Sequence, residues 1–482
     1  MQPGRGKIIP IIAAPDFDQE QSLYEVRKKI YPRAVSGWFA KWRWTLVFIT
    51  QLVFYASPWL SWNGRQAVLF DLAARKFYIF GIVFWPQDFI YLTILLLISA
   101  YSLFLFTAVA GRLWCGYTCP QTVYTEIFLW VERKIEGDRI AQMRLDNSAL
   151  SAHKIFLKSA KHGVWIAISL WTGFTFVGYF TPIQDLSREV ISFTLGPWEM
   201  FWLLFYGLAT YGNAGWLREQ VCKYMCPYAR FQGVMFDRDT LVVAYDEQRG
   251  EPRGSRSKKA IPAAVGLGDC VDCEICVQVC PTGIDIRQGQ QYECIGCTAC
   301  IDGCNQVMDK MGYAPGLIRY ASLNGVSQHL GWKEMIRRVF RPRVLIYSVV
   351  LWAIIIAASV SLYYRVPVKV DVIRDRNTLS REVGDGLIEN VYRLQIMNTE
   401  EQPRRLLITA SGVDDLKLGG VTMPIEIGAT STQMFTVNLR APAEKMPKGS
   451  TRIEFHIVPI DPAGKPDPGE FSLNEKSIFF KS

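Results

Sequence analysis

Eight of the twelve cysteines fall into two short groups with one repeated spacing, and this spacing constrains the fold more than any other feature of the chain. The groups are Cys270-x2-Cys273-x2-Cys276-x3-Cys280, followed by Pro281, and Cys294-x2-Cys297-x2-Cys300-x3-Cys304. A [4Fe-4S] cube needs four thiolate ligands, and a C-x2-C-x2-C loop supplies three of them from a short stretch of backbone. The repeated spacing therefore predicts a bacterial-type ferredoxin fold with two [4Fe-4S] clusters.

The fourth ligand of each cluster comes from the other cysteine group in two-cluster ferredoxins. This crossed pattern predicts the ligand sets Cys270, Cys273, Cys276 and Cys304 for the first cluster, and Cys294, Cys297, Cys300 and Cys280 for the second. Zinc is the competing interpretation, but zinc usually takes two C-x2-C pairs and would leave four of these eight thiols without a role. Asn305 stands where a proline would follow the second group, which leaves the ligand count unchanged.

The other four cysteines form two C-x3-C-P motifs, Cys115 to Pro120 and Cys222 to Pro227. A proline disfavours helical geometry at the residue before it and suits the first position of a helix, so Cys119 and Cys226 are expected at helix N-termini. The helix dipole is expected to lower the thiol pKa there. The residues leave two interpretations open. One is a redox-active metal site of soft thiolates that receives electrons from the clusters. The other is a set of structural thiols, or a structural zinc site that joins two helical hairpins.

Five apolar blocks approach the roughly 20 residues needed to cross a membrane as helices. They cover residues 44–62, 89–110, 164–182, 199–216 and 344–363. A buried core helix is the alternative for any single block, and it fits best the short, glycine-containing fourth block. Each C-x3-C-P motif follows two of the first four blocks, so the two halves resemble parallel repeats that bring both motifs to one membrane surface.

The distribution of Lys and Arg predicts the orientation of this anchor, because cytoplasmic flanks retain positive charge. Residues 1–43, 111–163 and 217–343 contain eight, eight and seventeen of them, whereas 63–88 and 183–198 contain three and one. The N-terminus and all twelve cysteines are thus expected in the cytoplasm, where grouped cysteines are more often metal ligands than disulfides. The net charge of +9 follows from this orientation, and no basic stripe indicates nucleic-acid binding.

A few polar and soft side chains near the predicted spans carry no assigned role. Asp88 and Asp185 lie on the non-cytoplasmic side, where interfacial anchoring and helix capping explain them better than a quinol or proton site. The four histidines are scattered, and the methionines near the cysteines are more typical of packing than of copper binding. No Gly-rich dinucleotide fingerprint follows a strand, so an NAD or FAD bound by a Rossmann unit is not expected.

The chain divides into seven expected segments. They are a cytoplasmic N-terminal segment (1–43), a four-helix transmembrane region (44–217), a basic linker (218–260), the ferredoxin-like domain (261–312), a cytoplasmic linker (313–343), a fifth transmembrane helix (344–364) and a periplasmic domain (365–482). The last segment alternates apolar and polar residues over 368–373, 391–397, 406–410, 433–439 and 451–457. This pattern predicts an antiparallel, immunoglobulin-like sandwich, and without cysteines or a catalytic cluster it is expected to be a docking module.

Several motifs together resemble those of the cytochrome oxidase accessory family called CcoG, FixG or RdxA, over nearly the whole chain. They are Ile30-Tyr31-Pro32-Arg33 with Gly37, residues 74–78 and 84–88, both C-x3-C-P motifs, the eight-cysteine insert and the C-terminal sandwich. NapH-like subunits share the ferredoxin motif alone. The order of spans, motifs, insert and sandwich is more specific to the oxidase accessory family.

This resemblance implies a protein of the bacterial inner membrane that reduces Cu(II) to Cu(I) during assembly of cbb3-type cytochrome oxidase. Its implied partners are copper chaperones or other oxidase assembly factors, and its electron donor stays unidentified. Cys115, Cys119, Cys222 and Cys226 would then bind or reduce copper as the catalytic thiols. Two other functions remain open: a quinol-type or ferredoxin-type electron conduit without a copper role, and a non-redox assembly scaffold.

Overall fold

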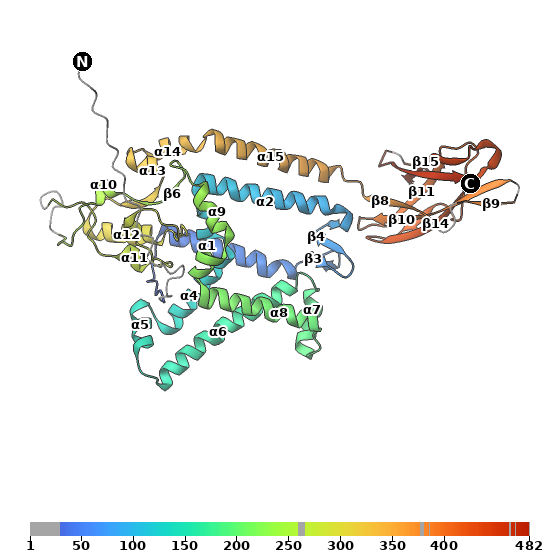
Figure 1. The fold of residues 1–482 in the computed structure, drawn as a ribbon. Coiled ribbons are helices and arrows are strands. Elements are labelled where there is room, and N and C mark those ends of the chain that lie inside the picture. Colours follow the sequence, from blue (N-terminus) through green and yellow to red (C-terminus); the bar gives the residue numbers. More distant parts are fainter. Residues whose placement is uncertain are drawn as a thin grey trace, which may run out of the picture.

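The structure is a computed structural model that describes residues 29–258, 266–375, 380–384, 386–461, 464–467 and 469–481. Some of the basic residues counted above lie outside the described residues: Arg27 and Lys28 of the N-terminal segment and Lys259 of the linker. Residues 261–265 of the ferredoxin-like segment also lie outside them. A bundle of long helices joins a cysteine-rich unit at one end to a β-sandwich at the other (Figure 1).

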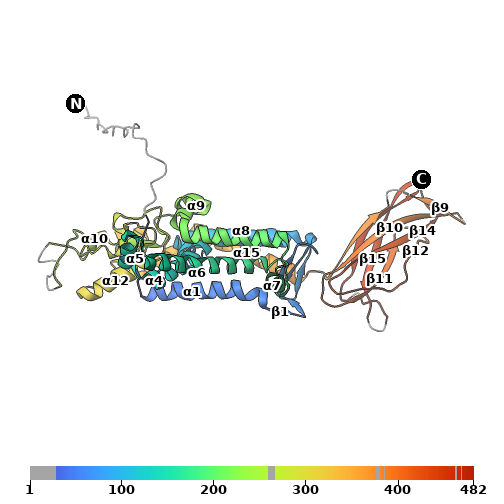
Figure 2. The same ribbon diagram turned by 90° about the horizontal axis from the view of Figure 1, so that it is seen from below.

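Five long helices form the bundle, and each overlaps one of the five predicted blocks. They are α1 (Trp38–Ala56), α2 (Phe89–Ala110), α6 (Ala152–Val177), α8 (Pro197–Thr210) and α15 (Pro342–Tyr363). Helix α6 packs against α8, and α2 packs against α15; Figure 2 shows α1, α6, α8 and α15 extending between the two ends of the molecule. Among the described helices, two stretches, Pro86–Ala110 and Pro342–Tyr363, are long and apolar enough to cross a membrane by length and composition.

Helices α1 and α6 begin and end earlier than the apolar blocks that predicted them. Helix α1 ends at Ala56 because the following turn, Ser57–Trp59, contains Pro58, which lacks a backbone N–H. Helix α6 begins in a basic segment, where the Ser151 hydroxyl accepts a hydrogen bond from the Lys154 N–H (3.2 Å). Hydropathy detects the apolar part of a helix and does not detect its polar extension.

The large side chains of α8 face outward, and this exposure disagrees with a buried core helix. Trp198 is 71% exposed and Leu208 is 67% exposed. After Thr210 the chain passes into a π-helical segment, Tyr211–Leu217, which leads to the second C-x3-C-P motif. The alternative of a core helix for the fourth block is therefore wrong.

The cysteine-rich end consists of further helices, of which α4 is the longest, and two short strands. They are α3 (Leu113–Tyr117), α4 (Pro120–Glu136), α5 (Arg139–Asn147), α9 (Pro227–Met235), α10 (Glu247–Gly250), α11 (Ile275–Gln278), α12 (Ala299–Met311), α13 (Leu323–Ser327), α14 (Trp332–Val339) and strands β6 (Val242–Tyr245) and β7 (Ile318–Ala321). Strand β6 pairs antiparallel with β7, with Val242 opposite Ala321. The prediction of linkers over 218–260 and 313–343 is therefore wrong, because both ranges contain helices and contribute paired strands. A basic and polar composition occurs both in linkers and in folded surface segments, so composition alone does not distinguish the two.

At the opposite end of the bundle, two small antiparallel sheets lie next to the sandwich, and α7 (Ile183–Ser192) lies at the same end of the bundle. The sheets are β1 (Ser61–Trp62) with β2 (Arg65–Gln66), and β3 (Val68–Asp71), β4 (Lys76–Ile79) and β5 (Ile82–Phe84). Val83 and Trp85 pack against Met397 of the sandwich. Asp88 is buried and pairs with Arg365 (2.5 Å) and Lys369. Its carboxylate also accepts a hydrogen bond from the Trp85 N–H (3.0 Å), in agreement with the predicted helix-capping role.

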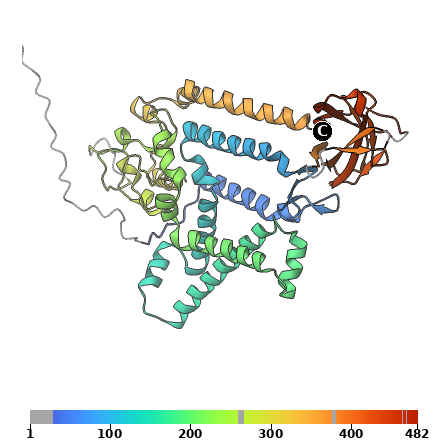
Figure 3. The same cartoon turned by 45° about the vertical axis from the view of Figure 1, so that its right-hand side comes forward.

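The C-terminal domain is a two-sheet antiparallel sandwich, as Figure 3 shows. One sheet contains β8 (Val368–Arg374), β9 (Arg381–Val383), β10 (Leu387–Asn398), β12 (Lys417–Gly419) and β14 (Thr432–Pro442); the other contains β11 (Arg404–Ser411), β13 (Ile425–Ile427), β15 (Gly449–Pro459) and β16 (Leu473–Lys481). Tyr392, Leu406 and Phe455 are fully buried in the core between the sheets. All five predicted strands are present. Strands β9, β12, β13 and β16 were not predicted. Strands β9, β12 and β13 have three residues each, which is too few for alternation to be detected, whereas the nine-residue strand β16 was missed.

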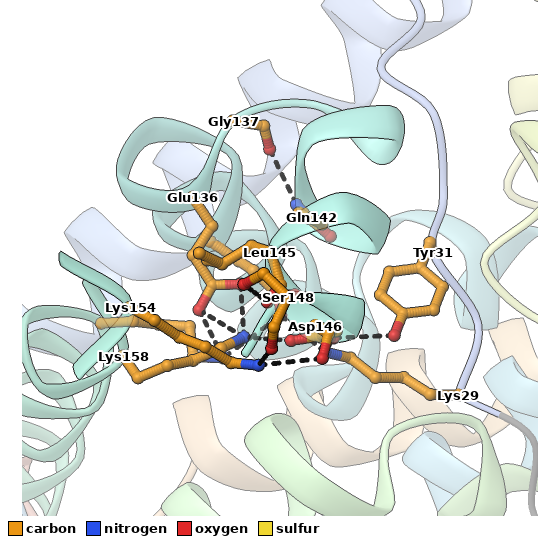
Figure 4. Close-up of polar contacts among 12 residues, drawn as sticks. Lys29, Tyr31, Glu136, Gly137, Gln142, Leu145, Asp146, Ser148, Lys154 and Lys158 are labelled. Carbon is orange, nitrogen blue, oxygen red and sulfur yellow. Dashed lines mark hydrogen bonds and ion pairs between the residues drawn. The ribbon is translucent and has the colours of Figure 1, made fainter. Parts of the chain in front are cut away.

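Residues 29–37 form a strap that connects the helical bundle to the cysteine-rich unit. The Tyr31 hydroxyl and the Lys29 ammonium group both contact the Asp146 carboxylate at 2.7 Å, as Figure 4 shows. Lys158 of α6 pairs with the same carboxylate at 2.6 Å. Two residues beyond Tyr31, the Arg33 N–H donates to the Gln278 carbonyl of α11 (2.8 Å). The strap therefore holds α5, α6 and the ferredoxin-like segment together.

We expect Asp146→Asn to lower the free energy of unfolding at pH 7 by about 1–3 kcal/mol, because three charge-assisted contacts converge on this carboxylate. Burial alone would raise the pKa of Asp146, but hydrogen bonds from Lys158, Lys29 and Tyr31 outweigh burial and hold the pKa well below its usual range. A carboxylate with a depressed pKa stabilises the fold above its unfolded pKa of about 4 and loses this effect as the pH falls.

The stability difference between wild type and Asp146→Asn should therefore narrow below about pH 4. Thermal unfolding of both proteins across the acid range measures it. The control is Asp185→Asn, because Asp185 pairs with Arg188 (3.2 Å) on the exposed surface of α7 and should contribute less than about 1 kcal/mol. A difference that stays constant with pH would contradict the prediction.

Candidate functional site

The first cysteine group surrounds a cavity together with one residue of the second group. Cys270, Cys273, Cys276 and Cys304 line this cavity of about 330 Å³. Cys276 comes from α11 and Cys304 from α12. The packing of these two short helices brings Cys304 to the first group. The cavity therefore contains the same four thiols that the crossed pattern predicts for the first cluster.

The second cysteine group surrounds a neighbouring cavity. Cys280, Cys294, Cys297 and Cys300 line this space of about 350 Å³, and Cys276 lines both cavities. Helix α12 separates the two sets by one turn, because Cys300 faces the second cavity and Cys304 faces the first. The two cavities thus share a wall, and the crossed assignment of ligands stays a prediction that this arrangement favours.

The two cysteine loops have the same unusual backbone geometry at equivalent positions. Asp272 and Glu274 have positive φ angles in the first loop, and Gly296 and Thr298 have positive φ angles in the second. Each pair stands two and four residues after the first cysteine of its group. Three of these residues are not glycine, so the left-handed conformation carries a cost that persists at functional sites. Such turns direct backbone N–H groups into a concave, anion-binding surface.

These features fit an iron-sulfur cluster in each cavity. Burial raises the pKa of Cys276, Cys297 and Cys304 to about 12. The thiols would therefore be protonated without metal, and binding of iron must displace the protons. Four sulfur donors and an apolar enclosure are what a cluster requires of its protein.

The two C-x3-C-P motifs meet at the bundle end that faces the second cavity. Cys119 and Cys226 are the residues that precede α4 and α9, as expected from the prolines that follow them. Cys115 lies in α3, whereas Cys222 lies in a π-helical turn, Val221–Met225. The other three cysteines each contribute to raising the pKa of the Cys222 thiol, so the two motifs lie in the same region of the molecule. This convergence agrees with the predicted repeat.

Burial raises the thiol pKa in these motifs, so the expectation of thiols activated by helix N-termini is wrong for Cys119. Backbone N–H groups of Thr122 and Gln121 do lower the pKa of Cys119, but burial outweighs them. Burial likewise raises the pKa of Cys115 to about 11 and of Cys222 to about 12. The sequence shows which residues start a helix, but it does not show how far tertiary packing removes them from water.

The first C-x3-C-P motif packs directly against the second cysteine loop. A Cβ atom on Gly116 would lie 2.5 Å from the Gly296 carbonyl oxygen and 3.0 Å from the Cys297 nitrogen. One residue further, the Tyr117 hydroxyl lies 2.7 Å from the Thr298 hydroxyl. Only a glycine allows this approach of two backbones. The motif and the predicted ligands of the second cluster are therefore in contact.

A cavity of about 430 Å³ lies between Cys222 and Cys297. Its other lining residues are Arg43, Gln121, Thr122, Thr125, Glu126, Leu129, Arg218, Glu219, Pro281, Thr282 and Ile295. The cavity places one thiol of the C-x3-C-P repeat and one predicted cluster ligand on the same open space. Within the part of the chain that the structure describes, no three His, Cys, Asp or Glu side chains are gathered as a site for a single metal ion. Metal binding by Cys115, Cys119, Cys222 and Cys226 stays a prediction.

Two arginines beside the second cysteine group were not singled out from the sequence. Arg43 of α1 is buried and donates to the Cys297 carbonyl (2.9 Å). Arg112 donates to the Cys294 carbonyl (2.9 Å) and crosses over to the Ala229 carbonyl of α9 (3.0 Å). Their placement depends on contacts across more than 100 residues of sequence, for which the sequence contains no local signal.

Gln232 and Asp302 also hold the site and were not predicted. The Gln232 amide nitrogen of α9 lies 3.4 Å from the Cys115 sulfur, which joins the two repeats. The Asp302 carboxylate of α12 accepts hydrogen bonds from the N–H groups of Phe39 (3.3 Å) and Ala40 (2.7 Å) at the start of α1. Because α12 also carries Cys300 and Cys304, this cap fixes both cysteine groups relative to the bundle.

Three family models match the chain. A 4Fe-4S dicluster domain matches residues 217–323, a 4Fe-4S binding domain matches residues 92–137, and the Ig-like fold at the C-terminus of FixG matches residues 358–482. The first match begins at residue 217 and covers the whole range predicted as a linker (218–260), in agreement with the folded elements found there. The second match covers α2 to α4 and contains Cys115 and Cys119.

Known relatives extend the similarity over most of the chain. Protein RdxA of Cereibacter sphaeroides is 40% identical over 93% of this chain and 97% of its own length. Nitrogen fixation protein FixG of Rhizobium meliloti is 40% identical over 81% of this chain and 80% of its own. The ferredoxin-type protein NapH of Haemophilus influenzae is 25% identical over 45% of this chain and 68% of its own.

The RdxA and FixG similarity spans the helices, both sets of cysteine motifs and the sandwich, whereas the NapH similarity covers less than half of the chain. The cysteine cavities and the dicluster match together indicate [4Fe-4S] clusters and electron transfer. The chain therefore belongs to the FixG/RdxA family and is an iron-sulfur electron-transfer protein of that family.

Proposed function

We propose that this protein reduces Cu(II) to Cu(I) at its four C-x3-C-P thiols, in copper delivery to a cbb3-type cytochrome oxidase. The clusters, when bound, supply single electrons, and the reduction of Cu(II) to Cu(I) takes one. The observation that carries the proposal is the backbone contact of Gly116 with Gly296 and Cys297. It brings the thiol repeat against the second cysteine loop, so the redox group and the soft ligands lie side by side.

The positions of the two cysteine groups support a direction for the relay. The second cysteine group contacts the C-x3-C-P repeat at Gly116, and its Cys297 lines a cavity together with Cys222. The first cysteine group adjoins the second through Cys276, which lines the cavities of both groups. We therefore infer that electrons move from the first cysteine group to the second, and then toward Cys222.

We propose the cavity between Cys222 and Cys297 as the path of the substrate ion to the thiols. Glu126, Glu219, Thr122 and Thr125 are among the residues that line it. Oxygen donors suit Cu(II) better than Cu(I), whereas thiolates favour Cu(I). An ion that passes from oxygen ligands of these residues to Cys222 would thus move to ligands that stabilise the reduced state.

The arrangement of the molecule supports a five-span anchor in a bacterial inner membrane. The five long helices extend between the cysteine-rich end and the sandwich (Figures 1 and 2). Two of them meet the length and composition of a membrane span. With the basic segments at the cysteine-rich end, we propose that this end faces the cytoplasm and the sandwich faces the periplasm.

The test is Cu(I) formation by the purified, anaerobic protein after reduction with dithionite, followed with a chromogenic Cu(I) chelator. Cys115→Ser, Cys222→Ser and Cys226→Ser should each slow it by at least about tenfold, since even groups that only orient a metal ligand contribute that much. Iron and acid-labile sulfide per chain should stay at the wild-type value in all three. Met225→Leu, a change at an exposed side chain of the same motif, is the control and should leave the rate unchanged.

Three results would redirect the assignment. Equal rates in wild type and the three serine variants would remove the copper role of the thiols. Oxidation of added quinol while Cu(II) stays unreduced would favour an electron conduit. Normal oxidase maturation in cells that carry folded cluster-ligand variants would favour a scaffold.

A further inference from the structure

Helix α14, which leads into α15, presents an exposed apolar stripe. Trp332 is 55% exposed, Ile336 is 39% exposed and Phe340, directly after the helix, is 66% exposed. These residues are four apart, so they lie along one face. Met335 lies on another face and is buried against Gly325, where a Cβ atom would approach its sulfur to 2.4 Å. Met335 therefore holds α14 to the body of the protein and leaves the stripe outward.

Cationic side chains flank this stripe. Lys333 and Arg337 are both exposed and again four residues apart. Arg338 is partly exposed and pairs with Asp239 (3.4 Å). The combination of an aromatic and aliphatic stripe with adjacent Lys and Arg is typical of helices that lie in a membrane interface.

The position of α14 matches that of the predicted membrane surface. Arg341, at the start of α15, donates to the Ala108 carbonyl near the end of α2 (2.6 Å). The junction of α14 and α15 therefore lies level with the end of α2, as Figures 1 and 3 show at the cysteine-rich end. Leu345 and Ile346 continue an exposed apolar surface along α15. The exposed apolar stripe on α14 is therefore followed directly in the sequence by exposed apolar residues of α15. Helix α15 is one of the two helices that are long and apolar enough to cross a membrane.

We propose that α14 lies in the headgroup layer of the cytoplasmic leaflet, with Trp332, Ile336 and Phe340 inserted and with Lys333 and Arg337 bound to anionic phospholipid headgroups. The inference rests on the part of the proposed function that places α2 and α15 across the bilayer. A protein partner fits less well, because the stripe adjoins a lipid-facing helix and its flanking charges match the negative inner leaflet. The contact would hold the ferredoxin-like segment close to the membrane surface.

Hydrogen exchange of the full-length protein tests the proposal, in nanodiscs of phosphatidylcholine alone and of phosphatidylcholine with phosphatidylglycerol. Peptides that cover residues 329–341 should exchange about twenty-five-fold more slowly with the anionic lipid, about fivefold for each of two engaged cations. Lys333→Ala/Arg337→Ala should remove this difference. The control Lys417→Ala/Lys448→Ala removes the same charge from exposed positions of the sandwich and should keep it.

Each outcome decides the proposal. Equal exchange of residues 329–341 in both nanodiscs, or slow exchange already in detergent, would overturn it. Loss of the lipid effect in the control variant would also overturn it. Peptides of α2 and α15 in the same data report the span itself. If they exchange rapidly, the membrane topology is wrong, whereas protected spans with an unprotected α14 would reject only the interfacial contact.

Discussion

The double variant Cys280→Ser/Cys294→Ser is expected to keep about half of the iron and acid-labile sulfide of the wild type, whereas Cys280→Ser/Cys270→Ser is expected to lose nearly all of both. Each cluster contributes about four iron atoms, so two clusters give about eight per chain. Cys280 and Cys294 line the same cavity, and Cys270 lines the other one. The first pair of changes therefore damages one ligand set, and the second pair damages both.

The same experiment separates the crossed assignment from a local one. If each cluster took its four ligands from one sequence group, Cys280→Ser/Cys270→Ser would damage one cluster and Cys280→Ser/Cys294→Ser would damage two. Under this local assignment the expected iron contents are reversed: Cys280→Ser/Cys270→Ser would keep about half of the iron, and Cys280→Ser/Cys294→Ser would lose nearly all of it. Electron paramagnetic resonance of the dithionite-reduced proteins would show which cluster signal persists. Cys304→Ser/Cys270→Ser is a further control, expected to resemble Cys280→Ser/Cys294→Ser because Cys304 and Cys270 line one cavity.

Gly116→Ala is expected to separate the C-x3-C-P repeat from the second cysteine loop, with a loss of about 1–3 kcal/mol in the free energy of unfolding, as for overpacking elsewhere. The added Cβ atom would lie 2.5 Å from the Gly296 carbonyl oxygen. Because the obstacle is backbone, no side-chain rotation can relieve it. We also expect slower Cu(I) formation at unchanged iron content, since the thiols move away from the second cavity.

Gly163→Ala is the matched control for this change. Gly163 lies within α6, and a Cβ atom there would have no neighbour within 4 Å. Alanine should be neutral or stabilise the helix by about 1 kcal/mol. Thermal unfolding and the rate of Cu(I) formation, measured for both variants, check the prediction. A wild-type melting temperature and rate in Gly116→Ala would mean that the close packing has no functional role.

The parts of the fold that follow local patterns were predicted well. The apolar blocks predicted the five helices of the bundle, and the alternating segments predicted β8, β10, β11, β14 and β15 but not β16. The positions of Cys119 and Cys226 before helices followed from the prolines after them. These features depend on residues within a few positions of one another. Helix ends were less accurate, as for α6, because its basic first turns have no hydropathy signal.

The amino-acid sequence by itself determined the kind of chemistry: eight thiols at cluster spacing, four more in C-x3-C-P motifs, and the helices and strands that carry them. Only the tertiary structure decided which thiols share a cavity, that Gly116 contacts the second cysteine loop, and that burial raises the pKa of Cys119. Spacing and periodicity are local properties of a chain. Burial and the approach of Arg112 to Cys294, 182 positions away, arise only when distant segments pack together and exclude water.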